Sequence, residues 1–121
     1  MRLLCADDEE DIRTILELAL GLDPELQVEL VDSGAAALER AATGSYDAIV
    51  LDAMMPGLDG YETCRRLKAA PETAGIPVVF LTAKTQRGEV DRALALGAVA
   101  CLMKPFDPLT IARELRTALG R

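Results

Sequence analysis

The chain has 121 residues, with 13 Lys or Arg against 20 Asp or Glu, and it contains no His. A net charge of −7 and an aromatic content of 3% argue against nucleic-acid binding, which needs clustered basic side chains and stacking platforms. The lack of His excludes every mechanism that uses a histidine base, nucleophile or metal ligand. The length predicts a single domain over residues 1–121 that builds its core without disulfides or structural metals.

The sequence shows neither a membrane span nor a disulfide framework. The longest apolar stretch, Ala93–Met103, is too short for a bilayer, which needs about 20 residues. The first apolar run meets Asp7 and Asp8 at once, so no signal peptide is expected. We therefore expect a soluble, cytoplasmic protein. The three cysteines are widely spaced and are expected to be reduced core residues: Cys5, Cys64 and Cys101.

Five short apolar runs are the strand candidates. They are separated by helical patterns, and the two central runs, AIVL and VVFL, are apolar on both faces. That pattern is typical of parallel strands that are covered by helices on both sides. The expected strands are Arg2–Ala6, Gln27–Val31, Ala48–Leu51, Val78–Leu81 and Val99–Met103.

Helical periods and capping residues alternate with these strands. Ser33, Asp59 and Asp107 are expected to cap the second, third and fifth helices, and Pro108 takes the first position of the fifth. Glycine ends the first, second and fourth helices. The second helix is expected at Ala35–Ala42, before Gly44, and the fourth at Gly88–Leu96, before Gly97. The other three helices are recognised by their apolar stripes. These are Ile12, Ile15, Leu16, Ala19 and Leu20 in the first helix, before Gly21; Tyr61, Cys64 and Leu67 in the third; and Leu109, Ala112, Leu115 and Leu119 in the fifth.

Five strand–helix units predict an α/β fold with a doubly wound, five-stranded parallel sheet. Right-handed crossovers place helices on both faces of such a sheet. In the strand order 2-1-3-4-5, the carboxyl ends of strands one, three, four and five adjoin. Ligands bind at that edge, near the point where the strand order reverses. Functional residues are therefore expected there.

Polar side chains follow each of these strands. Asp7 and Asp8 follow the first strand, Asp52 the third, Thr82 the fourth and Lys104 the fifth. Each has an ordinary alternative, as a helix cap, a turn residue or a solvated Lys. Their convergence would place three carboxylates together, and two like charges about 5 Å apart repel by roughly 3 kcal/mol at an effective dielectric of 20. Mg²⁺ offsets that repulsion, so the set predicts phosphoryl-transfer chemistry.

Four segments carry a family resemblance: LLCADDEEDIR, YDAIVLDAMMPGLDGYETCRRLK, IPVVFLTA and MKPFDPLTIARELR. They resemble the receiver domain of two-component response regulators, the family of the chemotaxis response regulator. The segments follow one another in the family order with matching intervals, and together they cover essentially the whole chain. The resemblance implies a flavodoxin-like fold with five helices around the five-stranded sheet.

The resemblance also implies an acceptor and a metal site. Asp52 looks like the phosphoacceptor. Asp7 and Asp8 look like the acids that bind Mg²⁺, with Asp52 and the backbone carbonyl of Met54 completing the protein ligands. The phosphodonor would be a phosphohistidine on a sensor histidine kinase or a phosphotransfer protein, because this chain has no His. The chain would then be a phosphoacceptor that assists its own phosphorylation and dephosphorylation, and not an enzyme.

Two further residues complete the implied site. Thr82 would bond a phosphoryl oxygen and reorient on phosphorylation, and Lys104 would pair with the phosphoryl group. The peptide bond between Lys104 and Pro105 is commonly cis in this family, an isomer that is accessible only before proline. Ala83 is small, as access to Asp52 requires.

One departure from the family pattern concerns the conformational switch. An aromatic residue usually stands three positions before the active-site Lys, and here that position is Cys101. A short thiol cannot fill the space of an aromatic ring, so we expect the switch to differ here from the usual pairing of Thr82 with an aromatic partner. The ordinary alternative is a core Cys within a strand. Met54 and Lys84 border the site, at positions where the family tunes the lifetime of the acyl phosphate.

Two other classes of function remain open at this stage. A magnesium-dependent phosphatase of the haloacid dehalogenase type also uses an Asp nucleophile, but it needs a second Asp where this chain has Met54. A pseudo-receiver that only binds partners would not need the five polar residues that are present here. The output is a downstream protein target or an output domain, in a stand-alone receiver or in an excised part of a larger regulator or hybrid kinase. Gly88–Leu96 and Asp107–Leu119 would form the partner-binding face, which also serves receiver–receiver dimers.

Overall fold

The structure is a computed structural model that describes residues 1–83 and 87–121. Within these ranges, strands and helices alternate along the chain, as the sequence predicts. The strands are β1 (Arg2–Ala6), β2 (Gln27–Val31), β3 (Ala48–Asp52), β4 (Val78–Thr82) and β5 (Ala100–Met103). The helices are α1 (Glu10–Leu20), α2 (Gly34–Thr43), α3 (Gly60–Ala69), α4 (Arg87–Ala95) and α5 (Ile111–Leu119).

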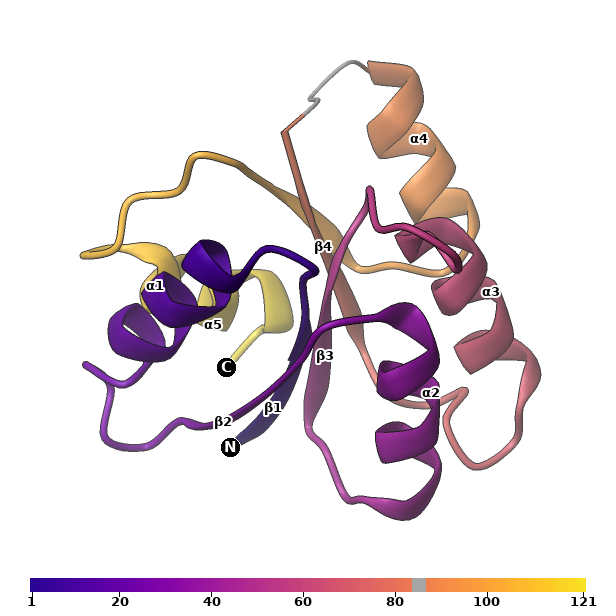
Figure 1. Cartoon of the computed structure of the whole chain (residues 1–121), viewed down its shortest axis with the longest axis horizontal. Coiled ribbons are helices and arrows are strands. Elements are labelled where there is room, and N and C mark those ends of the chain that lie inside the picture. Colours follow the sequence, from indigo (N-terminus) through magenta and orange to yellow (C-terminus); the bar gives the residue numbers. More distant parts are fainter. Residues whose placement is uncertain (84–86) are drawn as a thin grey trace.

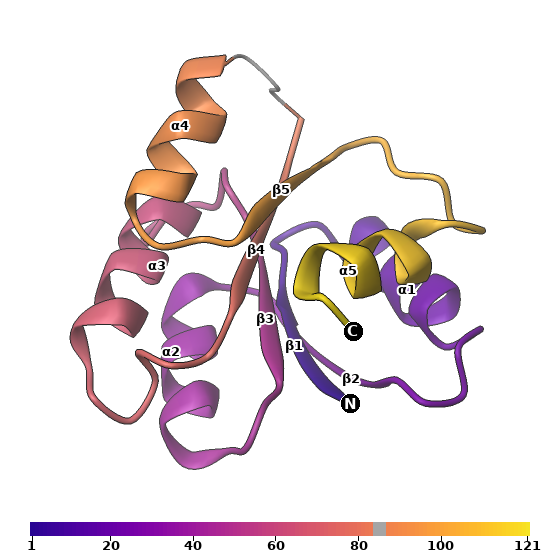
Figure 2. The ribbon, with the colours of Figure 1, turned by 180° about the vertical axis from the view of Figure 1, so that it is seen from behind.

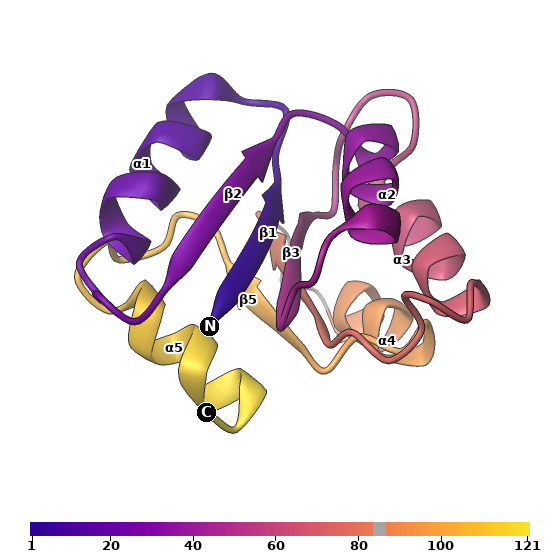
Figure 3. The same ribbon diagram turned by 90° about the horizontal axis from the view of Figure 1, so that it is seen from below.

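The strands form one parallel sheet in the order β2-β1-β3-β4-β5, which confirms the predicted α/β, doubly wound topology. Helices α1 and α5 cover one face of the sheet, and α2, α3 and α4 cover the other (Figures 1 and 2). Seen from below, the sheet lies between these two layers of helices (Figure 3). The strand order reverses between β1 and β3, and the helices that follow these two strands, α1 and α3, cover opposite faces of the sheet.

Alternating side chains of the strands supply a separate core for each face. Leu4, Ile49 and Phe80 pack toward α2, α3 and α4. Leu3 and Val50 pack toward α1 and α5. Since β3 and β4 are buried along their whole length, both faces must be apolar, and this explains the continuous apolar runs in the sequence.

Side-chain caps begin two of the helices where the sequence predicts them. Ser33 Oγ accepts a hydrogen bond from the amide of Ala36 at 3.1 Å. Asp59 Oδ1 accepts one from the amide of Glu62 at 2.8 Å. The second of these caps fixes the point where the chain turns back after β3, next to the polar edge of the sheet.

The start of α5 differs from the prediction. Asp107 Oδ1 accepts a hydrogen bond from the amide of Leu109 at 2.9 Å, but this closes a turn, and the helix begins only at Ile111 after Thr110. Leu109 lies in that turn with 83% of its surface exposed, so its assignment to the apolar stripe is wrong. Ile111 takes its place in the core instead.

Smaller differences concern the strand ends and one helix stripe. Strands β3 and β4 each extend one residue further than predicted, and thus include Asp52 and Thr82. Ile15 was expected on the buried stripe of α1 but is 40% exposed. The cysteines are free thiols, with Cys5 and Cys64 buried and Cys101 partly exposed. In the described part of the chain, no helix has the length and apolar character that a bilayer crossing requires.

Candidate functional site

Three carboxylates meet at the carboxyl edge of the sheet. Asp7 and Asp8 lie in the loop after β1, and Asp52 is the last residue of β3. One oxygen from each lies within 4.8 Å of the others. Asp7 and Asp52 are buried, whereas Asp8 is exposed, so the cluster opens to solvent on one side. The sequence-based expectation that these residues converge is confirmed.

Lys104 brings a positive charge into this cluster. Its Nζ lies 2.7 Å from Asp7 Oδ2 and 3.3 Å from Asp52 Oδ1, and its side chain is only 11% exposed. Its backbone amide donates to the carbonyl oxygen of Thr82 at 2.8 Å, which ties the end of β5 to β4. Burial lowers the pKa of Lys104, but the two carboxylates raise it, and the net direction is upward. The ammonium therefore stays charged between the two acids.

Asp52 has a perturbed protonation equilibrium. Burial and the charge of Asp7 raise its pKa to about 6, while Lys104 and the amide of Met54 act in the opposite direction. Met54 donates that amide to Asp52 Oδ1 at 3.2 Å. The carboxyl is consequently a stronger base than an ordinary Asp and still ionised at neutral pH.

The loop after β3 folds back closely over Asp52. Gly60 donates its amide to the carbonyl oxygen of Ala53 at 3.0 Å. A Cβ at Gly60 would lie 2.3 Å from the carbonyl oxygen of Asp52, so only glycine fits at this position. The sequence reasoning did not single out Gly60, although the Asp59-Gly60 pair ahead of a helical pattern was a signal for a tight approach.

The other predicted residues lie around the cluster. Thr82 is buried at the end of β4, adjacent to the residue that pairs with Asp52 in the sheet. Ala83 is exposed, and Met54 is 64% exposed. The Lys104–Pro105 peptide bond is cis, the isomer that the family resemblance implies. Lys84 lies outside the described residues.

Cys101 lies in β5 opposite Phe80 of β4 and packs against the core beneath α3 and α4. An aromatic side chain from α3 lies in the same region, because the ring of Tyr61 packs on Phe80 with centroids 5.1 Å apart. Tyr61 also donates its hydroxyl to Glu89 of α4, and the guanidinium of Arg92 stacks over its ring at 4.0 Å. The sequence identified Tyr61 only as a core residue, since nothing local indicates its contacts with α4.

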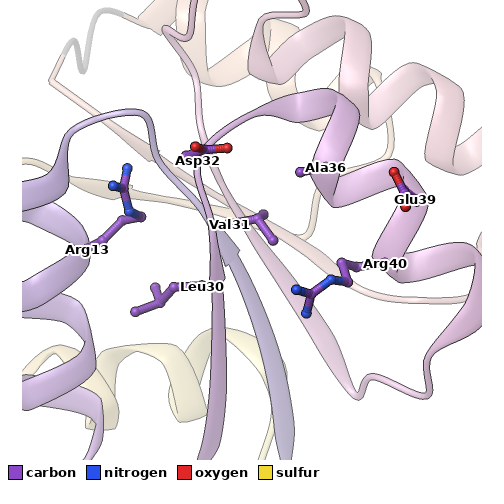
Figure 4. Close-up of a pocket in the computed structure, with 7 residues that line it drawn as sticks. All are labelled: Arg13, Leu30, Val31, Asp32, Ala36, Glu39 and Arg40. Atoms are coloured by element: carbon purple, nitrogen blue, oxygen red, sulfur yellow. The ribbon is translucent and has the colours of Figure 1, made fainter.

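The sequence reasoning also missed Arg13 of α1. Its Nη1 donates to the carbonyl oxygen of Asp7 at 2.9 Å. The available signal was a cationic residue one helical turn after the acidic loop. Figure 4 shows its guanidinium pointing toward the loop between β1 and α1.

The donor set fits a hydrated divalent cation. Three carboxylates and one ammonium leave two formal negative charges, which one divalent cation balances. Among the described residues, the buried Asp7 Oδ2 has the Lys104 ammonium as its partner and accepts no other hydrogen bond. Carboxylate oxygens beside an open, solvated side are the ligands that Mg²⁺ prefers. The use of the Met54 carbonyl as a further ligand stays a prediction.

Comparison with known families agrees with this chemistry. The family model of the response regulator receiver domain matches residues 3–116. The chain belongs to this family. Its general function is therefore that of a receiver domain in phosphorylation-switched, two-component signalling. The response regulator PleD of Caulobacter vibrioides is 40% identical over 116 residues, which cover 96% of this chain and 25% of that protein. The receiver thus matches about a quarter of the length of this relative.

Solved receiver structures share the fold over most of their length. The chemotaxis protein CheY4 of Vibrio cholerae superposes with a TM-score of 0.89 at 29% identity and covers 97% of both chains. The receiver domain of the sensor histidine kinase PA1611 from Pseudomonas aeruginosa superposes with a TM-score of 0.87 at 31% identity, over 99% of this receiver and 98% of that one. That structure has a magnesium ion coordinated in its active site cleft.

Proposed function

We propose that this receiver accepts a phosphoryl group on Asp52 from a phosphohistidine of a sensor histidine kinase or phosphotransfer protein, in a Mg²⁺-dependent reaction in the cytoplasm. The observation that carries the proposal is the meeting of three carboxylates with Lys104 at one edge of the sheet. A structural role does not require that much like charge in one place. A site for a cation and a phosphoryl group does.

The chemistry at Asp52 is a direct transfer. A carboxylate oxygen of Asp52 attacks the phosphorus, the new O–P bond forms as the N–P bond of the phosphohistidine breaks, and the electron pair stays on the imidazole nitrogen. The raised pKa of Asp52, about 6, makes this oxygen more nucleophilic while leaving it ionised at neutral pH. Lys104, already 3.3 Å from Asp52 Oδ1, neutralises charge on the transferred group.

Asp7, Asp8 and Asp52 would hold the cation, and bound Mg²⁺ would supply further neutralisation of the phosphoryl oxygens. Thr82 would then bond one of these oxygens through its hydroxyl. The receiver acts as a phosphoacceptor that assists its own phosphorylation and dephosphorylation. It does not turn over a separate substrate.

The signal is relayed by protein contacts, to a downstream target or to an output domain. We place these contacts on the face formed by α4, β5 and α5; Figure 2 shows β5 running between the two helices. Exposed apolar side chains lie in these elements and in the segment that joins α4 to β5, at 45% for Leu94, 48% for Val99 and 54% for Met103. A receiver–receiver dimer would use the same face. Sedimentation that does not change when a beryllofluoride phosphoryl mimic is added contradicts the dimer.

The phosphoacceptor assignment has a direct test. The wild-type chain is incubated with acetyl phosphate, with and without Mg²⁺, and its mass is measured. We expect one phosphoryl group per chain with Mg²⁺ and none in the Asp52→Asn variant. Asp32→Asn is the matched control, because Asp32 directly follows strand β2 at the same edge of the sheet but lies outside the carboxylate cluster. Equal labelling of the Asp52→Asn variant overturns the assignment.

A phosphatase of the haloacid dehalogenase type is the competing enzyme class. The position two residues after Asp52 is occupied by the exposed side chain of Met54, which cannot act as a general acid. Steady hydrolysis of a phosphomonoester such as p-nitrophenyl phosphate would favour that class over a receiver.

A further inference from the structure

Arg13 reaches from α1 back to the loop that carries the acidic cluster. It lies one helical turn after Glu9, the residue that precedes α1, and helical side chains lean toward the N-terminus of their helix. Its guanidinium therefore lies against the loop, where Nη1 donates to the carbonyl oxygen of Asp7 at 2.9 Å. The contact is partly buried, between α1 and the end of β2.

This carbonyl belongs to the peptide group that joins Asp7 to Asp8. A peptide group is planar, so a hydrogen bond that fixes the oxygen of Asp7 also fixes the direction in which the chain enters Asp8. The Asp7 amide is held separately, because it donates to Val31 of β2 at 3.1 Å. The Asp7 side chain accepts from the amide of Glu9 at 2.9 Å.

Asp8 has no comparable support of its own. It is the exposed member of the cluster, and in the part of the chain that the structure describes its carboxylate makes no hydrogen bond or ion pair. The Glu9 side chain makes no capping bond, so at the start of α1 the loop is closed by the hydrogen bond from the Glu9 amide to Asp7 Oδ1. The orientation of Asp8 toward Asp52 consequently depends on this bond and on the peptide group that Arg13 holds.

A second arginine provides an internal comparison. Arg13 and Arg40 line the same cavity of about 420 Å³ between α1 and α2, on opposite sides of the end of β2 (Figure 4). Arg40 pairs with Glu29 at 3.1 Å. Of these two arginines, only Arg13 contacts the acidic loop. Both side chains carry the same charge into the same cavity, so their substitutions differ mainly in the contact with Asp7.

We propose that Arg13 is a positioning residue of the cation site, which holds the Asp7–Asp8 peptide group so that the Asp8 carboxylate faces Asp52. This inference rests on the proposed function, since it assigns Arg13 a role in that same site. Loss of a residue that orients a ligand typically costs about 10- to 100-fold in metal affinity. For Arg13→Gln we expect Mg²⁺ to bind about tenfold more weakly.

The direction in which the Mg²⁺ affinity of Arg13→Gln changes distinguishes a positioning role from a purely electrostatic one. Removing a positive charge beside a cation site strengthens cation binding when charge alone acts. A weaker affinity in Arg13→Gln therefore requires the geometric effect to exceed the electrostatic one. Arg40→Gln removes the same charge without the contact, and we expect its affinity for Mg²⁺ to be unchanged or slightly higher. Arg13→Lys keeps the charge and one donor, and should recover part of the loss.

The test is calorimetric titration of Mg²⁺ into the metal-free full chain at pH 7.5, for wild type, Arg13→Gln, Arg13→Lys and Arg40→Gln. Weaker binding in Arg13→Gln with partial recovery in Arg13→Lys supports the proposal. Equal or tighter binding in Arg13→Gln overturns it. Circular dichroism checks that each variant is folded, and Arg13→Lys carries the test if Arg13→Gln is not.

A second measurement needs no metal. Hydrogen exchange of the Glu9 amide, which donates to Asp7 Oδ1, reports the order of the loop in the metal-free protein. We expect this amide to exchange about tenfold faster in Arg13→Gln while Leu16 and Leu20, on the buried side of α1, are unaffected. Equal acceleration along the whole helix assigns Arg13 a merely structural role and overturns the proposal. If wild type itself fails to bind Mg²⁺, the proposed function fails, whereas the exchange result still tests positioning.

Discussion

Replacing Asp52, the proposed phosphoacceptor, with a neutral isostere should stabilise the metal-free protein. Burial and the Asp7 charge raise the pKa of Asp52 from 3.8 to about 6, which means that folding disfavours its ionised form. Each pKa unit corresponds to 1.36 kcal/mol, so an ionised Asp52 costs the fold about 3 kcal/mol at pH 7.5. Asp52→Asn removes the charge and keeps the shape. We expect it to raise the free energy of unfolding by about 2–3 kcal/mol in the presence of EDTA.

The direction of the pKa shift at Asp52 also predicts how the stability of the wild-type protein changes with pH. Because the folded-state pKa is above the unfolded value, the unfolded state binds fewer protons between pH 3.8 and about 6, and this group's contribution to stability falls as the pH rises through that window. The cost is complete above about pH 6 and roughly half as large at pH 5. The advantage of Asp52→Asn should therefore be about 1.5 kcal/mol at pH 5 and should vanish below pH 4.

Urea unfolding followed by circular dichroism at pH 7.5 and pH 5 measures both values. Asp32→Asn is the control, because it removes a carboxylate outside the cluster and should leave stability nearly unchanged. Saturating Mg²⁺ should stabilise wild type and narrow its difference from Asp52→Asn. An Asp52→Asn variant that is less stable than wild type at pH 7.5 without metal, or a difference that does not change with pH, refutes the reasoning.

Three further predictions concern the surroundings of the site. Gly60→Ala should lower the free energy of unfolding in urea by about 2 kcal/mol and slow acyl-phosphate labelling, because the added Cβ would lie 2.3–3.0 Å from backbone atoms. Gly75→Ala is the control and should leave both unchanged, because nothing lies within 4 Å of the added Cβ. Lys104→Met should lower metal-free stability by about 3 kcal/mol, because it leaves a buried carboxylate unpaired, and thermal unfolding should show that Mg²⁺ restores much of it. Tyr61→Phe removes the hydroxyl that binds Glu89 and should cost about 1 kcal/mol; unchanged hydrogen exchange in α4 argues against that contact.

The sequence predicted the strands more accurately than the helix starts. A strand that is buried on both faces leaves a continuous apolar run, and both central strands were placed correctly to within one residue. The start of a helix depends on which of several polar side chains accepts hydrogen bonds from the free backbone amides of the first turn. Asp107 has the composition of a cap but closes a turn, and Leu109 then faces solvent. The pattern alone cannot distinguish an Asp that begins a helix from one that begins a turn ahead of it.

The acidic cluster was predictable because parallel topology brings strand ends together, whatever the side chains do between them. The residues that orient the cluster were not predictable in this way. Arg13 acts through a backbone oxygen, and any long donor at that position in α1 gives the same sequence pattern. Position 60 requires glycine because the backbone carbonyl of Asp52 approaches it closely. That approach is known only once the three-dimensional course of the loop after β3 is known.

The contacts that connect the site to α4, near Cys101, were also not predictable from the sequence. The sequence indicates that the usual aromatic of β5 is missing, but it does not show which side chain lies beside the thiol. In the structure, Tyr61 enters from α3 and packs on Phe80, which is paired with Cys101, and its hydroxyl binds Glu89 of α4, 28 positions along the chain. Tyr61 directly follows Gly60, which closely approaches the backbone of Asp52. A path of contacts from β3 to α4 therefore exists without an aromatic residue in β5, and it runs through the first turn of α3.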